Sequence, residues 1–268
     1  MYTATFRYLR AETLDQAQAL FGEHAEAKYL AGGQTLIPTM KQRLATPSTL
    51  IDIARIESLQ FIRREGSALV IGAATRHADV AASPDVRAAI PALATLAGLI
   101  GDPAVRHKGT LGGSIANNDP AADYPAAVLA LGATVKTTRR TIAGDAFFTG
   151  MFETALEEGE IITEVAFPLP ERAGYAKFPN PASRYALVGV FVAKFRSAVS
   201  VAVTGAASCV FRQEEMERAL SKRFAPDSVV DIKVSPEDLN SDLFGSAEYR
   251  AHLVTVMAKR AVTAALGS

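Results

Sequence analysis

The stretch AKYLAGGQTLIPTMKQRL, from Ala27 to Leu44, decides how we interpret this chain. Its first residues have the composition of a short buried strand, and two adjacent glycines, Gly32 and Gly33, follow directly. The same feature returns in KGTLGGSIANNDPAADYP, from Lys108 to Pro125. One glycine pair on its own marks a turn. Two pairs in similar surroundings indicate a shared function.

Backbone chemistry suggests what that function is. Glycine at positive φ lets successive backbone N–H groups converge, and the missing Cβ lets an anion reach the main chain. Two such turns from separate subdomains would hold a pyrophosphate between them, with the hydroxyls of Thr35, Thr110 and Ser114 as further donors. Tight turns or close strand crossings without a ligand are the alternative. The residues alone leave both interpretations open.

Composition bounds the class of protein. The chain has 268 residues, 49% hydrophobic and 21% charged, which predicts a folded protein of one large or two smaller domains. Lys plus Arg (28) balances Asp plus Glu (28), so no basic field exists to attract nucleic acid. No apolar block resembles a signal peptide, and no run approaches the roughly 18 to 20 residues of a membrane span. We therefore expect a cytoplasmic protein without a transmembrane segment.

Few residues are suited to metal or redox chemistry. Cys209 is the only cysteine, which excludes an internal disulfide and an iron–sulfur cluster ligated by this chain alone. We expect its side chain to be a small buried group. The four histidines, His24, His77, His107 and His252, include no pair at i, i+3 or i, i+4 spacing, so we expect no metal site. No acid–base or nucleophile constellation is apparent.

The first half of the chain reads as a compact β-α-β unit followed by further strands and helices. Residues 3–11 alternate like a strand, residues 12–23 have a helical apolar face, and AKYL and residues 49–56 are short strands. The glycines are contiguous, so this is not the G-x-G-x-x-G fingerprint of a dinucleotide-binding fold.

After this unit we predict a hairpin over residues 61–72, with a polar turn from Glu65 to Ser67. Two short helices separated at Pro91 should follow, then a helix that hands over to a strand at Gly132. A further strand ends at the prolines Pro168 and Pro170.

Beyond Gly174 the pattern changes, and residues 185–195 and 197–211 are typical of a strand meander with a polar hinge at Arg196 and Ser197. Amphipathic helices over residues 213–224 and 246–267 come next. We predict a carboxy-terminal domain made of a three-stranded sheet backed by helices.

The residue sequences of the two glycine motifs closely resemble those of one family. Two stretches are similar to the FAD-binding medium subunit of the molybdenum hydroxylases, such as carbon monoxide dehydrogenase and xanthine dehydrogenase. They are AGGQTLIPTMKQRLATPSTLIDIARI (Ala31–Ile56) and GTLGGSIANNDPAADYPAAVLALGA (Gly109–Ala133). Further matches are EIITEVAFPLP (Glu160–Pro170) and YAKFPNPASRYALVGV (Tyr175–Val190), so the resemblance spans essentially the whole chain.

The resemblance implies an α+β fold of the p-cresol methylhydroxylase type. Residues 1–172 would form the FAD-binding domain, with subdomains of about 1–56 and 57–172, and residues 173–268 the carboxy-terminal domain. Lys177 would lie near the pyrimidine edge of the flavin and raise its reduction potential by charge attraction. The implied cofactor contacts are Tyr29, Leu30, Ala31, Gly32, Gly33, Gln34, Thr35, Leu36, Ile100, Thr110, Leu111, Gly112, Gly113, Ser114, Asp123, Ile162 and Lys177. Tyr185, Asn117 and Asn118 are candidates of lower rank.

The resemblance also implies partners. A large subunit would hold the molybdenum cofactor and a small subunit two 2Fe-2S clusters, in a dimer of heterotrimers. FAD would be the only cofactor of this chain, which would have no catalytic residue of its own and would pass electrons to an external acceptor. Association with the inner face of the membrane through the complex is compatible with this.

Several alternatives stay open from the sequence. A stand-alone flavin-dependent oxidoreductase of the same fold would need a proton donor and a carboxylate facing the flavin, which we do not identify. A flavin-free scaffold subunit would fold without nucleotide. The substrate could be carbon monoxide, a purine, an aldehyde or an N-heterocycle, and the acceptor a quinone, NAD or dioxygen.

Overall fold

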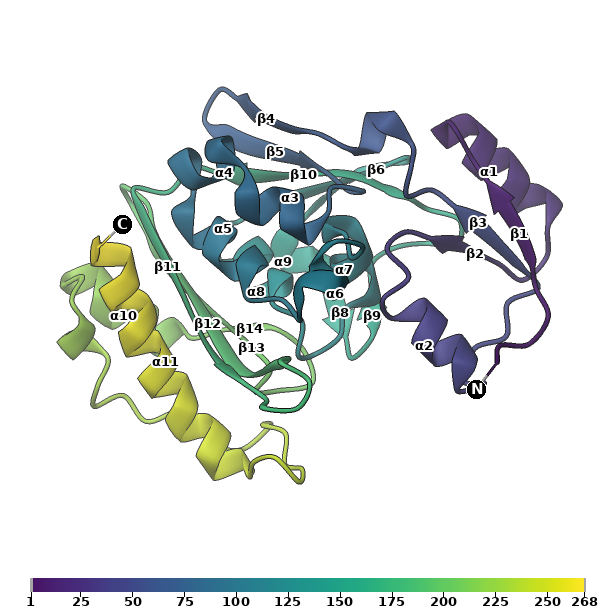
Figure 1. Ribbon diagram of the computed structural model, residues 1–268. Helices are drawn as coiled ribbons and strands as arrows, with labels where there is room; N and C mark the ends of the chain where they lie inside the picture. The colour runs from purple at the N-terminus through teal and green to yellow at the C-terminus, as the bar shows by residue number, and fades with distance from the viewer. Residues whose placement is uncertain (1, 268) are drawn as a thin grey trace.

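The computed structural model describes residues 2–267, which form three larger β-sheets and one two-stranded ribbon, with helices between and around them (Figure 1). The predicted α+β class is confirmed. Each larger sheet is built from one continuous part of the sequence: the first before residue 53, the second between 62 and 168, and the third from 172 to 212. The domain limits themselves stay a prediction.

The first sheet is the predicted β-α-β unit, with parallel strands in the order β1-β3-β2. Helix α1 begins where the hydroxyl of Thr13 accepts a hydrogen bond from the backbone N–H of Gln16 at 3.1 Å. The crossover from β2 to β3 carries the first glycine pair and a short helix, α2, that the sequence did not predict. The elements are β1 (Arg7–Arg10), α1 (Leu14–Glu23), β2 (Ala27–Leu30), α2 (Leu36–Lys41) and β3 (Thr49–Asp52).

The second sheet is antiparallel, in the order β4-β5-β10-β6-β7. The predicted hairpin and the helix break at Pro91 are both confirmed. The strands are β4 (Ile62–Glu65), β5 (Ala68–Gly72), β6 (Thr134–Thr137), β7 (Thr141–Ala143) and β10 (Ile162–Pro168), and the ribbon is β8 (Phe148–Gly150) with β9 (Glu153–Thr154). The helices are η1 (Glu57–Leu59), α3 (His77–Ala82), α4 (Pro84–Ala89), α5 (Pro91–Gly98), α6 (Pro103–Arg106), α7 (Leu111–Asn117), α8 (Tyr124–Ala130) and α9 (Gly144–Phe147).

The third sheet has one more strand than predicted, in the order β11-β12-β13-β14. After β13 the chain turns at Gly205 (φ +84°) and returns as the two-residue strand β14, which is too short to show an alternating pattern. In this return loop Cys209 is half-buried, so the prediction of a buried thiol is wrong. The elements are β11 (Arg172–Pro179), β12 (Ala186–Lys194), β13 (Val199–Thr204), β14 (Phe211–Arg212), α10 (Glu214–Lys222), η2 (Pro226–Ser228) and α11 (Ala247–Gly267).

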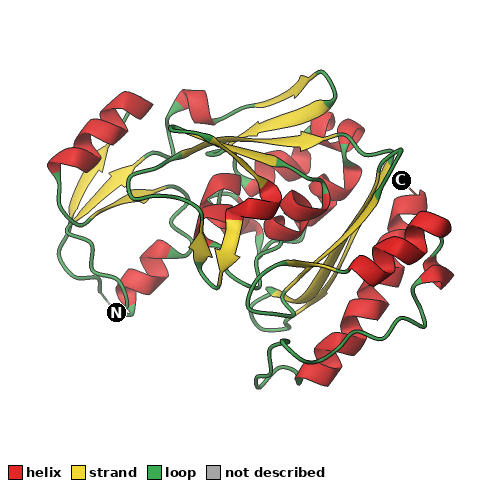
Figure 2. Cartoon of the chain, turned by 180° about the vertical axis from the view of Figure 1, so that it is seen from behind, coloured by secondary structure: helices red, strands yellow, loops and turns green. Residues whose placement is uncertain are grey.

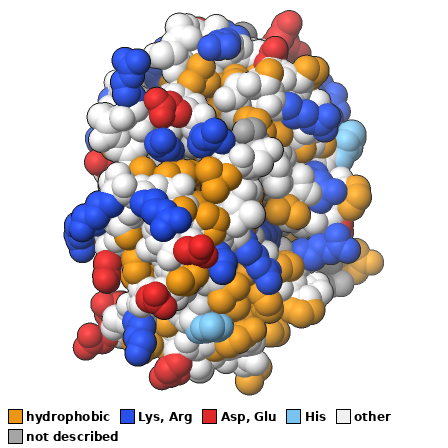
Figure 3. All heavy atoms as spheres, turned by 90° about the vertical axis from the view of Figure 1, so that its left-hand side faces the viewer, with side chains coloured by type: hydrophobic (Ala, Val, Ile, Leu, Met, Phe, Trp, Pro, Cys, Tyr) orange, Lys and Arg blue, Asp and Glu red, His pale blue; other side chains and the backbone are white. Residues whose placement is uncertain are grey.

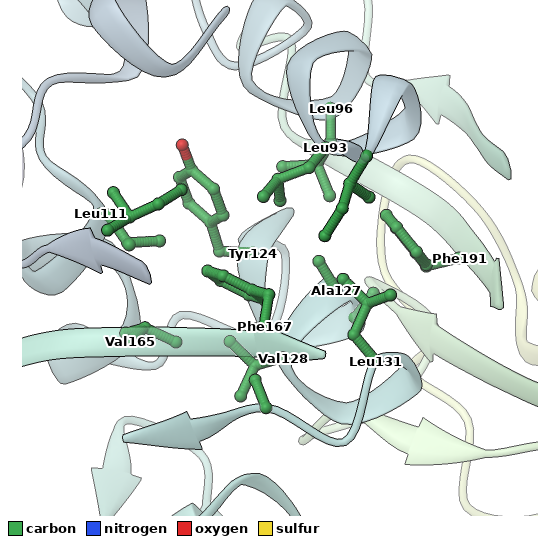
Figure 4. Packing of buried hydrophobic residues seen from close by; sticks show 14 of the residues in the cluster. Leu93, Leu96, Leu111, Tyr124, Ala127, Val128, Leu131, Val165, Phe167 and Phe191 are labelled. Carbon is green, nitrogen blue, oxygen red and sulfur yellow. The ribbon is translucent and has the colours of Figure 1, made fainter. Parts of the chain in front are cut away.

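The main core lies between the second sheet, helices α3, α4, α5, α7 and α8, and the inner face of the third sheet. Figure 4 shows Leu93, Tyr124, Phe167 and Phe191 meeting there from four different elements. Strand β12 is buried on both faces, because α11 packs against its outer face, while α10 covers the neighbouring strand β13 on the same side of the sheet (Figure 2). This explains the near-continuous apolar run in its sequence.

On the face formed by the carboxy-terminal helices, acidic, basic and apolar side chains are interspersed (Figure 3). That face therefore offers no field of a single sign. Within residues 2–267, none of the helices combines the length and the apolar composition that a membrane crossing requires.

Candidate ligand-binding cleft

A cavity of about 870 Å³ lies between the first sheet, the helices that follow β5, and the turn between β11 and β12. Its size suits a cofactor or other small ligand, for which pockets of about 300–1,000 Å³ are typical. Most of the predicted contacts line it: Tyr29, Leu30, Ala31, Gly32, Gly33, Gln34, Thr35, Leu36, Ile100, Thr110, Gly112, Gly113, Ser114, Asp123 and Ile162. Of the candidates of lower rank, Tyr185 and Asn117 also line it.

The first glycine motif forms the loop between β2 and α2. Gly33 has φ +69°, a conformation that glycine adopts without strain. Within residues 2–267, no hydrogen bond involves the backbone N–H groups of residues 32–35, although all four residues line the cleft. A row of free amide donors beside a cavity is suited to an anionic group.

The second glycine motif is built differently from the prediction. Gly112 and Gly113 lie in the first turn of α7, not at positive φ. Their N–H groups are already used: that of Gly113 donates to the Thr110 hydroxyl at 3.1 Å, and that of Gly112 to the carbonyl of Ala73 at 2.8 Å. A Cβ at Gly112 would lie 2.6 Å from the Ala73 Cβ. Glycine is therefore needed here for close packing of α7 against the end of β5.

The two motifs touch each other. A Cβ at Gly32 would lie 2.3 Å from the carbonyl oxygen of Lys108 and 2.6 Å from the Cα of Gly109. A Cβ at Gly113 would lie 3.6 Å from that of Ala31. The structure thus brings both glycine pairs to one groove. Because Gly32 has no side chain, the loop between β2 and α2 can contact the backbone of Lys108 and Gly109.

Asp123 belongs to a buried polar cluster beside the cleft. The ammonium of Lys177 lies 2.9 Å from its carboxylate and donates to the carbonyl of Leu99 at 3.1 Å, and the hydroxyl of Tyr175 donates to the same carboxylate. Burial raises the pKa of Asp123, while Lys177 and Tyr175 act in the opposite direction. Asp123 is 4% exposed, so its charge depends on these partners.

Three predicted residues do not line the cleft. The ammonium of Lys177 is paired with the carboxylate of Asp123, and Lys177 is not among the residues that line the cleft. Lys177 therefore does not present an unpaired positive charge to a ligand there. The side chain of Leu111 is fully buried in the main core. Asn118 (φ +43°) is also buried, and its amide donates to the carbonyls of Gly150 and Glu153 at 2.8 Å, which fastens the β8–β9 ribbon.

The sequence analysis missed the wall formed by residues 156–161. Glu160, whose side chain is inaccessible to solvent, accepts hydrogen bonds from Thr137, from the Glu157 N–H and from Arg140, with which it forms an ion pair at 3.1 Å. Burial opposes its charge, but the Arg140 guanidinium and the other donors lower the pKa of Glu160 to about 2. The hydroxyl of Tyr29 meets this wall at the carbonyl of Gly159, at 3.4 Å.

His77 is a second residue that the sequence analysis did not assign to the cleft. It lines the cavity from the start of α3 and is 4% exposed. Burial, and then the charge of Arg106, lowers the pKa of His77 to about 4. Among the described residues, no group of three or more His, Cys, Asp or Glu side chains could hold a metal ion.

Comparisons with known proteins identify the family to which the chain is similar. A family model described as the FAD binding domain in molybdopterin dehydrogenase matches residues 4–170. The chain is 38% identical to the carbon monoxide dehydrogenase medium chain of Hydrogenophaga pseudoflava, over 99% of this chain and 98% of that one. It is 34% identical to the glyceraldehyde dehydrogenase medium chain of Sulfolobus acidocaldarius, over 97% and 98%. The solved structure of quinoline 2-oxidoreductase from Pseudomonas putida 86 is similar with a TM-score of 0.90, at 26% identity over 100% of this chain and 99% of that one.

Proposed function

Because the chain belongs to the family of FAD-binding medium subunits of the molybdenum hydroxylases, we propose that it passes electrons from 2Fe-2S clusters of a partner subunit through FAD to an external acceptor. As a member of that family it is an oxidoreductase subunit with FAD as its cofactor and the fold of the p-cresol methylhydroxylase type. The groove shared by the two glycine motifs is the observation that supports the FAD site in this chain.

The residues of the groove fit the chemistry of FAD. The unpartnered N–H groups of residues 32–35 would bind the pyrophosphate, with the hydroxyls of Thr35, Thr110 and Ser114 as further donors. Ile100 and Ile162 would supply apolar contacts, and Asp123 would accept hydrogen bonds. When bound, FAD supplies a ring system that can exchange electrons singly or in pairs.

The donor of the electrons would lie on another chain. A 2Fe-2S cluster takes four ligands, usually cysteines, and Cys209 is the only cysteine here. We therefore propose a small subunit with two 2Fe-2S clusters and a large subunit with the molybdenum cofactor, assembled as a dimer of heterotrimers in the cytoplasm. The FAD-binding domain would be residues 1–172, and the carboxy-terminal domain residues 173–268.

Two measurements test this proposal. The purified chain should be yellow and show flavin absorbance, and material drawn down with it from its own host should contain molybdenum and iron. A well-folded chain that neither contains nor binds FAD would refute the first part. Copurification of FAD protein without either metal, together with turnover of an organic substrate by the chain alone, would favour a stand-alone flavoenzyme.

A matched pair of variants locates the cofactor. Gly33 and Gly66 both have positive φ, so alanine strains the backbone similarly at each position. Only Gly33 lies in the cleft, and a Cβ at Gly66 meets nothing within 4 Å. We expect Gly33→Ala to weaken FAD binding by about tenfold, equivalent to the loss of about one hydrogen bond to a charged group, and Gly66→Ala to leave it unchanged. Equal affinities would place FAD elsewhere.

A further inference from the structure

His77 is held tightly against the second glycine motif. Its backbone N–H donates to the carbonyl of Gly109 at 2.9 Å. A Cβ at Gly109 would lie 2.6 Å from the Nε2 atom of the imidazole and 2.8 Å from its Cδ2. The edge of the ring that carries Nε2 therefore faces Gly109, which also lines the cleft.

Behind this ring lie two buried polar atoms without partners. Within residues 2–267, neither the Nδ1 atom of His77 nor the hydroxyl of Tyr124 has a hydrogen bond, and both are closed to solvent. The two rings are neighbours, with centroids 5.4 Å apart and planes inclined at 44°. In Figure 4 the Tyr124 oxygen points away from Phe167.

Unpartnered buried polar atoms are rare, because each loses its hydrogen bonds to water on folding. A single internal water between the neighbouring rings would satisfy both atoms, since buried waters bridge polar groups of this kind. Burial, and then the charge of Asp123, raises the pKa of Tyr124, so its hydroxyl keeps its proton and can donate. The water would in turn donate to Nδ1.

The charge state of His77 limits its ring to one N–H. With its pKa lowered to about 4 by burial and by Arg106, the imidazole is neutral at neutral pH. A neutral imidazole whose Nδ1 accepts a hydrogen bond carries its proton on Nε2. Because Nδ1 is closed to solvent, Nε2 is the nitrogen that can meet a ligand in the cleft.

We propose that His77 is a cofactor-binding residue: a water held by the Tyr124 hydroxyl fixes its Nε2–H form, and this N–H donates to an oxygen of FAD beside the second glycine motif. The inference rests on the proposed location of FAD in the cleft. Tyr124 is then a positioning residue that acts through His77.

The first test needs no cofactor. Nitrogen-15 NMR of the full 268-residue chain without FAD should show His77 protonated at Nε2 and unprotonated at Nδ1. Tyr124→Phe keeps the buried ring and removes the donor, so the Nδ1–H form should gain population in that variant. Protonation at Nδ1 in the unaltered chain, or no change in Tyr124→Phe, would overturn the proposal.

The second test separates the two nitrogens by binding. His77→Gln keeps an N–H near the position of Nε2, whereas His77→Asn keeps one only near Nδ1. We expect the dissociation constant for FAD to stay within about threefold in His77→Gln and to rise by about tenfold in His77→Asn. Equal affinities for both variants and the unaltered chain would overturn the role of His77. Failure of the unaltered chain to bind FAD would refute the proposed function, and the NMR measurement would still decide the proton position.

Discussion

Replacing Gly32 by alanine should separate the two halves of the cleft. Gly32 is not at positive φ, so alanine can adopt its backbone conformation and the effect comes from contact alone. The new Cβ would lie 2.3 Å from the carbonyl oxygen of Lys108, whereas real Cβ atoms essentially never come closer than 3.0 Å to a neighbour. The backbones must therefore move apart by about 0.7 Å or more, because no flexible side chain can yield.

Overpacking of this kind costs about 1–3 kcal/mol. We expect Gly32→Ala to lower the free energy of unfolding by that amount, measured by urea titration followed by circular dichroism. FAD affinity should fall as well, since the displaced loop carries the free amides of residues 32–35. Isothermal titration of the FAD-free chain measures this second effect.

Gly22→Ala is the matched control. Gly22 is exposed in α1, and a Cβ there meets nothing within 4 Å. Alanine in a helix is favoured over glycine by about 0.5–1 kcal/mol, so this variant should be more stable than the unaltered chain and bind FAD equally. If Gly32→Ala matched Gly22→Ala in the free energy of unfolding and in affinity for FAD, the close contact of Gly32 with Lys108 and Gly109 would be refuted.

The other predictions concern packing and buried charge. Gly112→Ala should lower the free energy of unfolding by about 1–3 kcal/mol, because its Cβ would collide with Ala73, directly after β5; urea titration measures this, and an unchanged value would contradict the packing. The pKa of Glu160 is about 2 in the folded chain and 4.5 as its ordinary value, so its stabilisation is present above pH 4.5 and is lost as pH falls towards 2. Glu160→Gln should therefore flatten the fall of melting temperature across that range; parallel curves would count against the buried ion pair. Lys177→Met should destabilise by about 3–5 kcal/mol by leaving Asp123 unpaired, and Asp123→Asn in the same chain should restore part of this loss; an additive double variant would show that the two charges are not coupled.

Local patterns were enough to predict the elements that obey them. The hairpin over residues 61–72 has a polar turn between apolar runs, and the helix break at Pro91 follows from the missing N–H of proline. Helix α2 was missed because it has six residues with Pro38 among them. Strand β14 was missed because two residues show no periodicity.

The same limit applies to the site: local sequence features could be predicted, whereas tertiary contacts could not. Glycine pairs can be located from sequence, but the tertiary contact decides which neighbour requires the absence of a side chain. At Gly112 that neighbour is Ala73, directly after β5. Leu111 has its side chain in the core although its neighbours line the cleft. Lys177 and Asp123 are 54 residues apart, and no local pattern reveals that they pair. Glu160 and His77 were missed because what distinguishes them is their burial, and burial depends on the fold and not on a local sequence pattern.

The pairing of Asp123 with Lys177 has a consequence for synthesis on the ribosome. A nascent chain that stops short of Tyr175 already contains both glycine motifs, yet it lacks the Tyr175 hydroxyl and the Lys177 cation that satisfy the buried carboxylate. Closure of that region in the growing chain would leave an uncompensated charge in the interior. We therefore expect the region around Asp123 to close late in folding, after the first strand of the third sheet has emerged.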